Sequence, residues 1–77
     1  MKIKVIYLAR LSEDIGKKEE HLELSKSEAT VEDIFLKLNL DKIKYSIYSA
    51  KNYEHSNFNS IVRDGDEIAF FPTITGG

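Results

Sequence analysis

The sequence predicts a single α+β domain of two layers, a sheet covered on one face by one main helix. Three observations lead to this prediction. The chain has 77 residues, which is below the usual domain size of about 100–150 residues. Segments with strand-type alternation lie near both ends, and one strongly periodic helical segment lies between them. No linker or repeat interrupts the chain, so we expect one domain over residues 1–77.

The first part of the chain predicts a strand, a short helix and a second strand. Residues 2–9 begin with alternating polar and apolar side chains and then become apolar on both faces. Residues 10–16 carry two apolar side chains four positions apart and end on Gly16, which is typical of a short helix with a glycine cap. Residues 17–20 read as a polar turn, and residues 21–24 alternate again, which predicts a strand paired with the first.

The main helix has the strongest local signal. It follows a predicted loop over residues 25–29 and begins at Thr30, whose hydroxyl can cap the helix while Asp33 reaches back to the cap residue. Asn39 and Asp41 are expected to end it. Its predicted buried face repeats at helical spacing and consists of Val31, Ile34, Phe35 and Leu38.

The second part of the chain predicts two further strands. Residues 45–51 alternate between two faces, whereas residues 52–60 are polar and read as a loop that Phe58 anchors to the core. Residues 63–66 predict a turn whose glycine takes a positive φ. Residues 67–71 are the last strand, which is strongly apolar. Because so small a core is marginally stable, we expect some apolar surface to be reserved for a partner.

Composition excludes several functional classes. The chain has no cysteine, so it cannot be a disulfide scaffold, a thiolate zinc module or a thiol enzyme. Eleven basic against thirteen acidic residues give a net charge of −2, which argues against a nucleic-acid partner. No segment is typical of a signal peptide or a membrane span, so we expect no membrane association and a cytoplasmic location.

The interior of the sequence contains no pattern of catalytic or metal-ligating residues. His21 and His55 have no ligand spacing around them, and we interpret both as isolated surface histidines. The acidic residues Asp64, Asp66 and Glu67 do not fit a calcium-binding loop. We therefore predict no metal site, no permanently bound cofactor and no active site within the domain.

The C-terminal segment is different, because half of the four glycines are the last two residues. It leaves the last apolar strand at Pro72 and contains no charged side chain up to Gly77. Glycines lack a Cβ, so this end can pass through a slot that would exclude any side chain. Fully extended, the segment spans roughly 20 Å. An alternative interpretation is an ordinary frayed terminus.

The segment from Asp64 to Gly77, Asp-Gly-Asp-Glu-Ile-Ala-Phe-Phe-Pro-Thr-Ile-Thr-Gly-Gly, resembles the C-terminal motif of a known family. That family is the small, sulfur-carrying subunit of molybdopterin synthase. Residues 7–16 are similar to the family's first strand and short helix, while Thr30-Val31 and residues 50–52 also fit, so the resemblance covers the whole chain.

The resemblance implies a ubiquitin-like β-grasp fold: a mixed sheet on one main helix, a short extra helix after the first strand, and a flexible Gly-Gly tail over residues 72–77. It implies that an adenylating enzyme similar to ubiquitin E1 uses ATP to activate the Gly77 carboxylate. A persulfide donor then converts it to a thiocarboxylate. Gly76 would be the spacer that fits a narrow slot.

The implied partner is the large synthase subunit, in a heterotetramer of two small and two large subunits. The tail would deliver sulfur there to a pterin precursor, cyclic pyranopterin monophosphate, to build the dithiolene of the molybdenum cofactor. This chain would have no activity alone. The expected partner contacts are Leu8, Phe71, Ile74 and Thr75, although Leu8 and Phe71 can equally be read as core.

Departures from the family pattern leave alternatives open. Thr73 replaces a frequent second proline, which implies a less stiff tail. Ser12 replaces a frequent arginine, and residues 52–60 are unusually rich in Asn and Ser. The alternatives are a thiamine-pathway sulfur carrier, a ubiquitin-like modifier that forms isopeptide bonds, and a binding module whose terminus has no role.

Overall fold

A computed structural model describes residues 1–72, in which seven strands, two α-helices and one 3₁₀ helix follow one another. The elements are β1 (Lys2–Tyr7), α1 (Arg10–Ile15), β2 (Glu19–Glu23), β3 (Glu28–Thr30), α2 (Val31–Lys37), the 3₁₀ helix η1 (Leu40–Lys42), β4 (Ile47–Lys51), β5 (Glu54–Ser56), β6 (Ile61–Arg63) and β7 (Glu67–Pro72). The predictions for Thr73, Ile74, Thr75, Gly76 and Gly77 lie outside the described residues.

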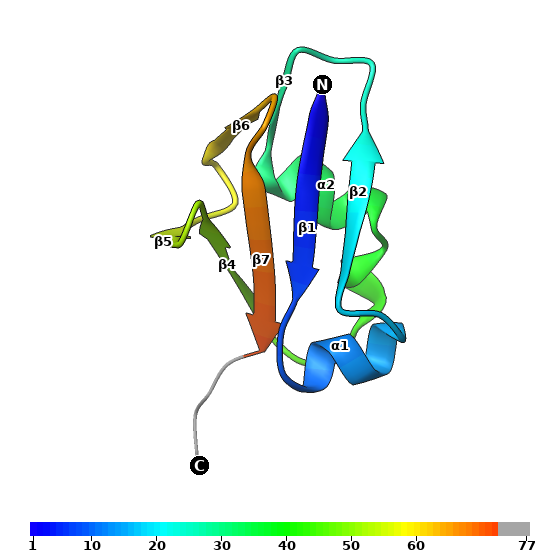
Figure 1. The fold of residues 1–77 in the computed structure, drawn as a ribbon. Coiled ribbons are helices and arrows are strands. Elements are labelled where there is room, and N and C mark those ends of the chain that lie inside the picture. Colours follow the sequence, from blue (N-terminus) through cyan, green and yellow to red (C-terminus); the bar gives the residue numbers. More distant parts are fainter. Residues whose placement is uncertain (73–77) are drawn as a thin grey trace.

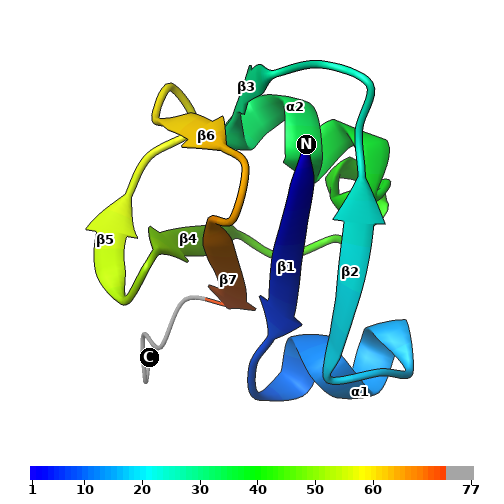
Figure 2. The ribbon, with the colours of Figure 1, turned by 45° about the horizontal axis from the view of Figure 1, so that its top comes forward.

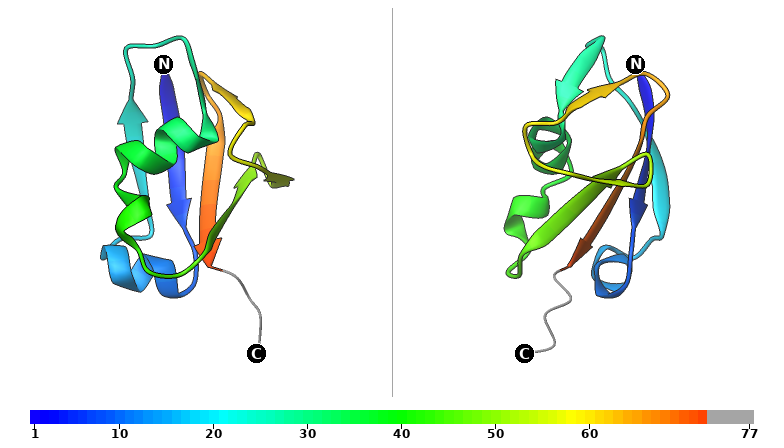
Figure 3. Two further views of the ribbon diagram at one scale, coloured as in Figure 1. Left: turned by 180° about the vertical axis from the view of Figure 1, so that it is seen from behind. Right: turned by 90° about the vertical axis from the view of Figure 1, so that its left-hand side faces the viewer.

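Five strands form a mixed sheet in the order β2-β1-β7-β4-β5, as Figure 1 shows. The central pair β1 and β7 is parallel, and its outer neighbours are antiparallel. Helix α2 packs behind this sheet, on the face seen in the left view of Figure 3. The predicted two-layer α+β architecture, with a mixed sheet on one main helix and a short helix after the first strand, is therefore confirmed.

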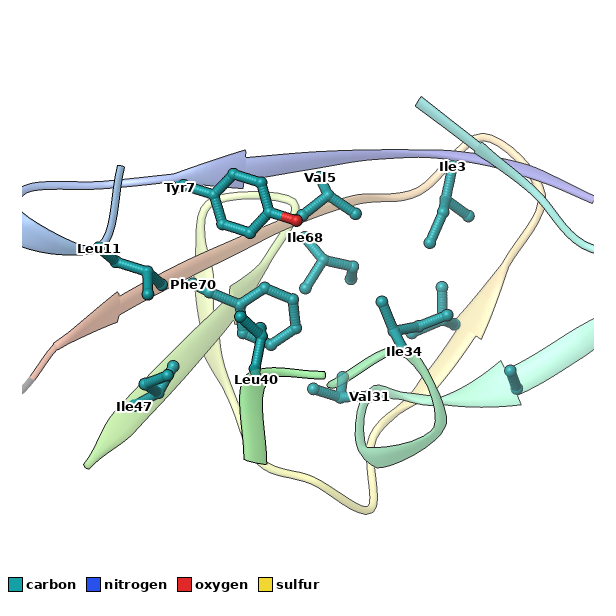
Figure 4. Close-up of a cluster of buried hydrophobic side chains, with 12 residues drawn as sticks. Ile3, Val5, Tyr7, Leu11, Val31, Ile34, Leu40, Ile47, Ile68 and Phe70 are labelled. Atoms are coloured by element: carbon teal, nitrogen blue, oxygen red, sulfur yellow. The ribbon is translucent and has the colours of Figure 1, made fainter. Parts of the chain in front are cut away.

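The core lies between α2 and the inner face of the sheet (Figure 4). Alternate residues of β1 and β7 point into it, because successive side chains of a strand face opposite sides. Leu11 of α1 and Leu40 of η1 close its end next to α1. The largest fully buried side chains are Phe70, Leu11, Ile34, Leu40, Ile68, Val5, Val31 and Val62.

The short strands are where the sequence prediction was wrong. Residues 25–29 and 52–60 were expected to be loops, but they contain part of β3 and all of β5. β3 pairs with β6 as a separate two-stranded sheet, and β5 pairs with β4 at the edge of the main sheet (Figure 2). Each of these strands has three residues, too few to show a period. These segments form strands because they pair with neighbouring strands, and not because of a pattern in their own sequences.

Element boundaries also shift. β2 begins at Glu19, inside the segment expected to be a turn, because Glu19 pairs with Ile6 of β1. β4 begins at Ile47, two residues later than predicted. Asn39, expected at the end of α2, takes a positive φ of 60° there, and the unpredicted η1 follows. Gly16 has the predicted left-handed conformation, with φ 90°.

A strained turn joins β4 to β5. Lys51 pairs with Glu54, which leaves Asn52 and Tyr53 as the connection, and their φ values are 50° and 72°. Positive φ at both central residues is the signature of a type I′ hairpin turn, whose second position strongly favours glycine. A tyrosine there costs about 1 kcal/mol or more of conformational energy.

Candidate functional site

The candidate site is the outer face of the sheet, which Figure 1 shows from the front. Its residues come from β1 and the residue that follows it, from β7 and from β4, at the positions that alternate with the core positions. In β1 and β7 the register pairs Ile6 with Ala69, and the Leu8 amide donates to the Phe70 carbonyl at 3.0 Å. We call the resulting surface the outer-face patch; its residues are Ile6, Leu8, Tyr48, Ala50, Ala69 and Phe71.

The two predicted partner contacts that can be located both lie in this patch. Leu8 is 44% exposed and Phe71 is half-buried, so neither belongs to the core. Sequence alternation left their assignment open, because the first and last strands are apolar on both faces near their ends. Their places in the fold make them available for contact with a partner.

Aromatic rings gather around Phe71. The Tyr48 ring lies 6.2 Å from the Phe71 ring between centroids, and the His55 ring lies 5.9 Å away, each at 84° to it. This edge-to-face geometry is favourable for aromatic pairs. His55 was predicted to be an isolated surface histidine. It is exposed, but it packs on the outer-face patch, whereas the exposed His21 lies on the edge strand β2.

Charged side chains border the patch at the Lys4 end. The Lys4 Nζ atom lies 3.1 Å from the nearest Glu19 carboxylate oxygen and 3.7 Å from the Glu67 Oε1 atom. The hydrogen bond and charge of Glu19 raise the pKa of Lys4, and the charge of Glu67 adds to this effect. Interaction with the neighbouring Glu67 carboxylate likewise raises the pKa of the Tyr53 hydroxyl. The border is thus a paired charge network next to an apolar surface.

A shallow hollow of about 280 Å³ lies within this face. Its walls combine patch residues with Tyr53 from the β4–β5 turn and Glu67 from the start of β7. The lining residues are Ile6, Leu8, Ala50, Tyr53, Glu67, Ala69 and Phe71. Six of these seven residues are uncharged, so the hollow is suited to an apolar side chain.

The turn after Leu8 has its own support. Ala9 takes a positive φ of 54°, and the Ser12 hydroxyl donates to the Ala9 carbonyl at 2.8 Å. Ser12 stands where the resembled family often has an arginine. In this chain the residue stabilises the backbone that carries Leu8 out of β1.

The short helix α1 is also tied to the segment before β4. The Tyr45 hydroxyl donates to Asp14 Oδ2 at 2.6 Å, and the Arg10 guanidinium lies 4.8 Å from the centre of the Tyr45 ring. The Arg10 Nε atom is also 3.5 Å from the same Asp14 oxygen. These contacts hold α1 at the end of the sheet, beside Leu8.

Within residues 1–72, no three His, Cys, Asp or Glu side chains are grouped so that they could hold a metal ion. The same part of the chain contains no helix of the length and apolarity that a membrane crossing needs. A larger hollow of about 570 Å³ lies between α2 and β4, and its lining is largely apolar.

Sequence reasoning missed Ile6, Tyr48, Tyr53 and His55 as members of this face. Ile6 and Tyr48 are on β1 and β4, where the outward positions follow from alternation once the register is known. Tyr53 had a detectable signal. Asn52 is a residue type that favours positive φ, and it follows a strand-like segment, so a tight hairpin after residue 51 was predictable.

Comparisons with known structures support the same fold. Small archaeal modifier protein 1 from Haloferax volcanii is 23% identical, with a TM-score of 0.82 over 100% of both chains. A putative molybdopterin converting factor, subunit 1, from Pyrococcus furiosus is 24% identical, with a TM-score of 0.80 over 96% of this chain and 99% of that chain. At this level of identity the likeness establishes the fold, which is the ubiquitin-like β-grasp.

Two sequence comparisons complete these findings. No curated protein matches the chain. The model of the ThiS family matches residues 5–77, nearly the whole sequence. With the β-grasp fold in place, this match leads to one conclusion: the chain belongs to the ThiS family of ubiquitin-like sulfur carriers.

Proposed function

We propose that this chain is the sulfur-carrying small subunit of a molybdopterin synthase. The observation that supports it most directly is the position of β7. This strand lies in the middle of the sheet, carries Phe71 in the outer-face patch, and leads at Pro72 into the segment that ends in Gly76-Gly77. A central strand is a rigid base, so a partner that docks on the patch can take up the segment that follows.

The proposed chemistry takes place at the Gly77 carboxylate. A carboxylate is a poor electrophile, so an E1-like adenylating enzyme first joins it to AMP with release of pyrophosphate from ATP. The outer sulfur of a persulfide donor then attacks the carbonyl carbon and AMP leaves, which gives an acyl disulfide. A thiol of the donor system cleaves its S–S bond, and the products are the thiocarboxylate and a disulfide on the donor side. The carrier holds no cofactor permanently, and the sulfur travels on its terminus. Gly76 serves as the spacer that lets the terminus enter a narrow site.

The proposed partner for delivery is a large synthase subunit, in an assembly of two small and two large chains. Similarity to a putative molybdopterin converting factor, subunit 1, supports this choice. Leu8 and Phe71 are the proposed contacts within the described residues, and Ile74 and Thr75 are proposed beyond them. The acceptor would be cyclic pyranopterin monophosphate, which becomes the dithiolene of the molybdenum cofactor.

Two other functions keep the same tail chemistry. Similarity to small archaeal modifier proteins supports a modifier that joins its terminus to lysines. The family match also supports a sulfur carrier of the thiamine pathway. Each uses adenylation of a terminal carboxylate, so the first step does not distinguish them.

The test is intact-mass measurement after co-expression with the adenylating enzyme of the same organism. We expect a mass increase that corresponds to replacement of one oxygen by sulfur, and no increase in a chain that lacks Gly77. Adducts on cellular lysines would favour the modifier instead. An unchanged mass, with full function in the shortened chain, would contradict every carrier role. Complementation of strains deficient in molybdenum cofactor or thiamine synthesis then separates the two pathways.

A further inference from the structure

Tyr53 has an unusual combination of strain and exposure. Its φ of 72° lies in the left-handed region, where a bulky side chain is disfavoured. Strain of this kind is normally offset by packing, yet Tyr53 is 89% exposed. Within the domain, therefore, the ring makes few contacts. Packing does not explain why this position holds a tyrosine instead of a glycine or an asparagine.

The turn around Tyr53 is nevertheless firmly held. The Asn52 amide donates to the Glu67 carbonyl at 2.8 Å, and the Glu67 amide donates to Asn52 Oδ1 at 2.9 Å. The Asn52 side-chain nitrogen also donates to Asp66 Oδ1 at 3.1 Å. These three bonds fix the hairpin tip against the start of β7. The Tyr53 ring is thereby placed on one wall of the hollow in the outer-face patch.

The charges around the hollow indicate what it can receive. Among residues 1–72, Glu67 is the one charged residue that lines it, and the Lys4 ammonium lies 3.7 Å from the Glu67 carboxylate. The Lys4 ammonium thus balances the charge of the Glu67 carboxylate. An occupant needs no charge of its own, so the complementary group is an apolar side chain.

We infer that Tyr53 is a specificity-determining contact, whose strained backbone presents its ring to an apolar side chain of the enzyme that adenylates this chain. This inference rests on the proposed carrier function. The adenylating enzyme is the partner that all three carrier roles require, so the inference does not depend on the pathway. Tyrosines that become buried when two proteins bind are often among the residues that contribute most to the binding energy.

The experiment measures ATP–pyrophosphate exchange with the purified adenylating enzyme, at varied concentrations of the carrier. We expect Tyr53→Gly to raise the KM for the carrier about tenfold, which is the effect of losing one moderate interface contact. The kcat should stay within twofold, because the reacting terminus is untouched. The thermal midpoint should not fall, because glycine favours this turn.

Two further variants separate contact from structure. Tyr53→Phe keeps the ring and loses only the hydroxyl, so its KM should stay within about threefold of the wild-type value. Leu36→Ala is the matched control, because Leu36 is an exposed apolar residue on α2. It lies outside the outer-face patch and should not change the KM.

The experiment distinguishes failure of the inference about Tyr53 from failure of the proposed carrier function. If the unaltered chain supports no exchange, adenylation itself is wrong. If the unaltered chain is active and Tyr53→Gly has the same KM, the inference about Tyr53 is wrong and the carrier function stands. An equal KM increase in Leu36→Ala, or a lowered thermal midpoint in Tyr53→Gly, would also overturn the inference.

Discussion

At the residue scale, each of the first three backbone amides of α2 has its own acceptor. The Val31 amide donates to the Ser60 carbonyl at 2.9 Å, and the Glu32 amide donates to the Phe58 carbonyl at 3.0 Å. The Asp33 amide donates to the Thr30 hydroxyl at 3.1 Å. The amides at a helix start have no partner within the helix, so this arrangement removes a cost that α2 would otherwise carry.

The capping box makes α2 sensitive to pH through Asp33. Its carboxylate accepts a hydrogen bond from the Thr30 amide at 3.0 Å, and this bond is the main reason that the pKa of Asp33 is lowered from 3.8. A carboxyl group whose pKa is lower in the folded state stabilises the fold above its unfolded pKa. That contribution is lost as the pH falls through the folded pKa.

We therefore expect Asp33→Asn, which keeps an acceptor oxygen and removes the charge, to be less stable than the wild type at neutral pH. The difference should shrink below about pH 4 and vanish once Asp33 is protonated. Urea unfolding at a series of pH values measures it. Glu32→Gln is the control, since Glu32 is in the same helical turn but is not the partner of Thr30. A pH-independent difference would contradict this account.

At the element scale, the segment between β5 and β6 anchors α2 to the rest of the fold. The ring of Phe58 lies 4.9 Å from that of Phe35, between centroids, and the Phe58 carbonyl caps the helix. Phe58 was expected to anchor this polar segment to the core; its ring instead packs on Phe35, which lies against the core, and Phe58 itself is not part of the buried cluster. Phe58 is 38% exposed, so it contributes less free energy to folding than a completely buried phenylalanine would.

Removing this ring should cost a measurable part of the stability. We expect Phe58→Ala to lower the free energy of unfolding by about 1–2 kcal/mol, from lost apolar burial and the lost ring pair. Chemical denaturation with intrinsic tyrosine fluorescence or circular dichroism gives the value. Phe58→Leu keeps most of the apolar volume and should lose less than half as much. Equal stability of the alanine variant and the wild type would show that the segment anchors through its backbone alone.

The elements that sequence predicted well are the ones that local signals determine. Thr30 and Asp33 lie three residues apart, so the start of α2 could be found without knowing the fold. β3 depends instead on the pairing of Ala29 with Val62, far along the chain. The candidate site divides in the same way. Leu8 and Phe71 were identified through a family resemblance, but their common face follows from the parallel pairing of β1 with β7.

At the scale of the whole molecule, the core and the terminus are separate parts of the chain. The buried hydrophobic cluster extends from Ile3 to Phe70, within the described residues. The outer-face patch lies on the opposite side of the same sheet, and β7 belongs to both. One strand therefore contributes to stability through Ile68 and Phe70 and to the proposed docking surface through Ala69 and Phe71.

This separation predicts the effect of one extra residue after Gly77. We expect the extended chain to accept no sulfur, because the added residue moves the carboxylate and places a side chain where the slot accepts only glycine. The thermal midpoint should stay within about 1 °C, since ΔΔG is close to zero when no core contact changes. Intact-mass measurement and thermal unfolding test the two statements together. The same residue inserted after Ser25, in an exposed loop, should leave sulfur loading intact. An extended chain that is shown to be untrimmed and still gains sulfur would place the reactive carboxylate somewhere other than Gly77.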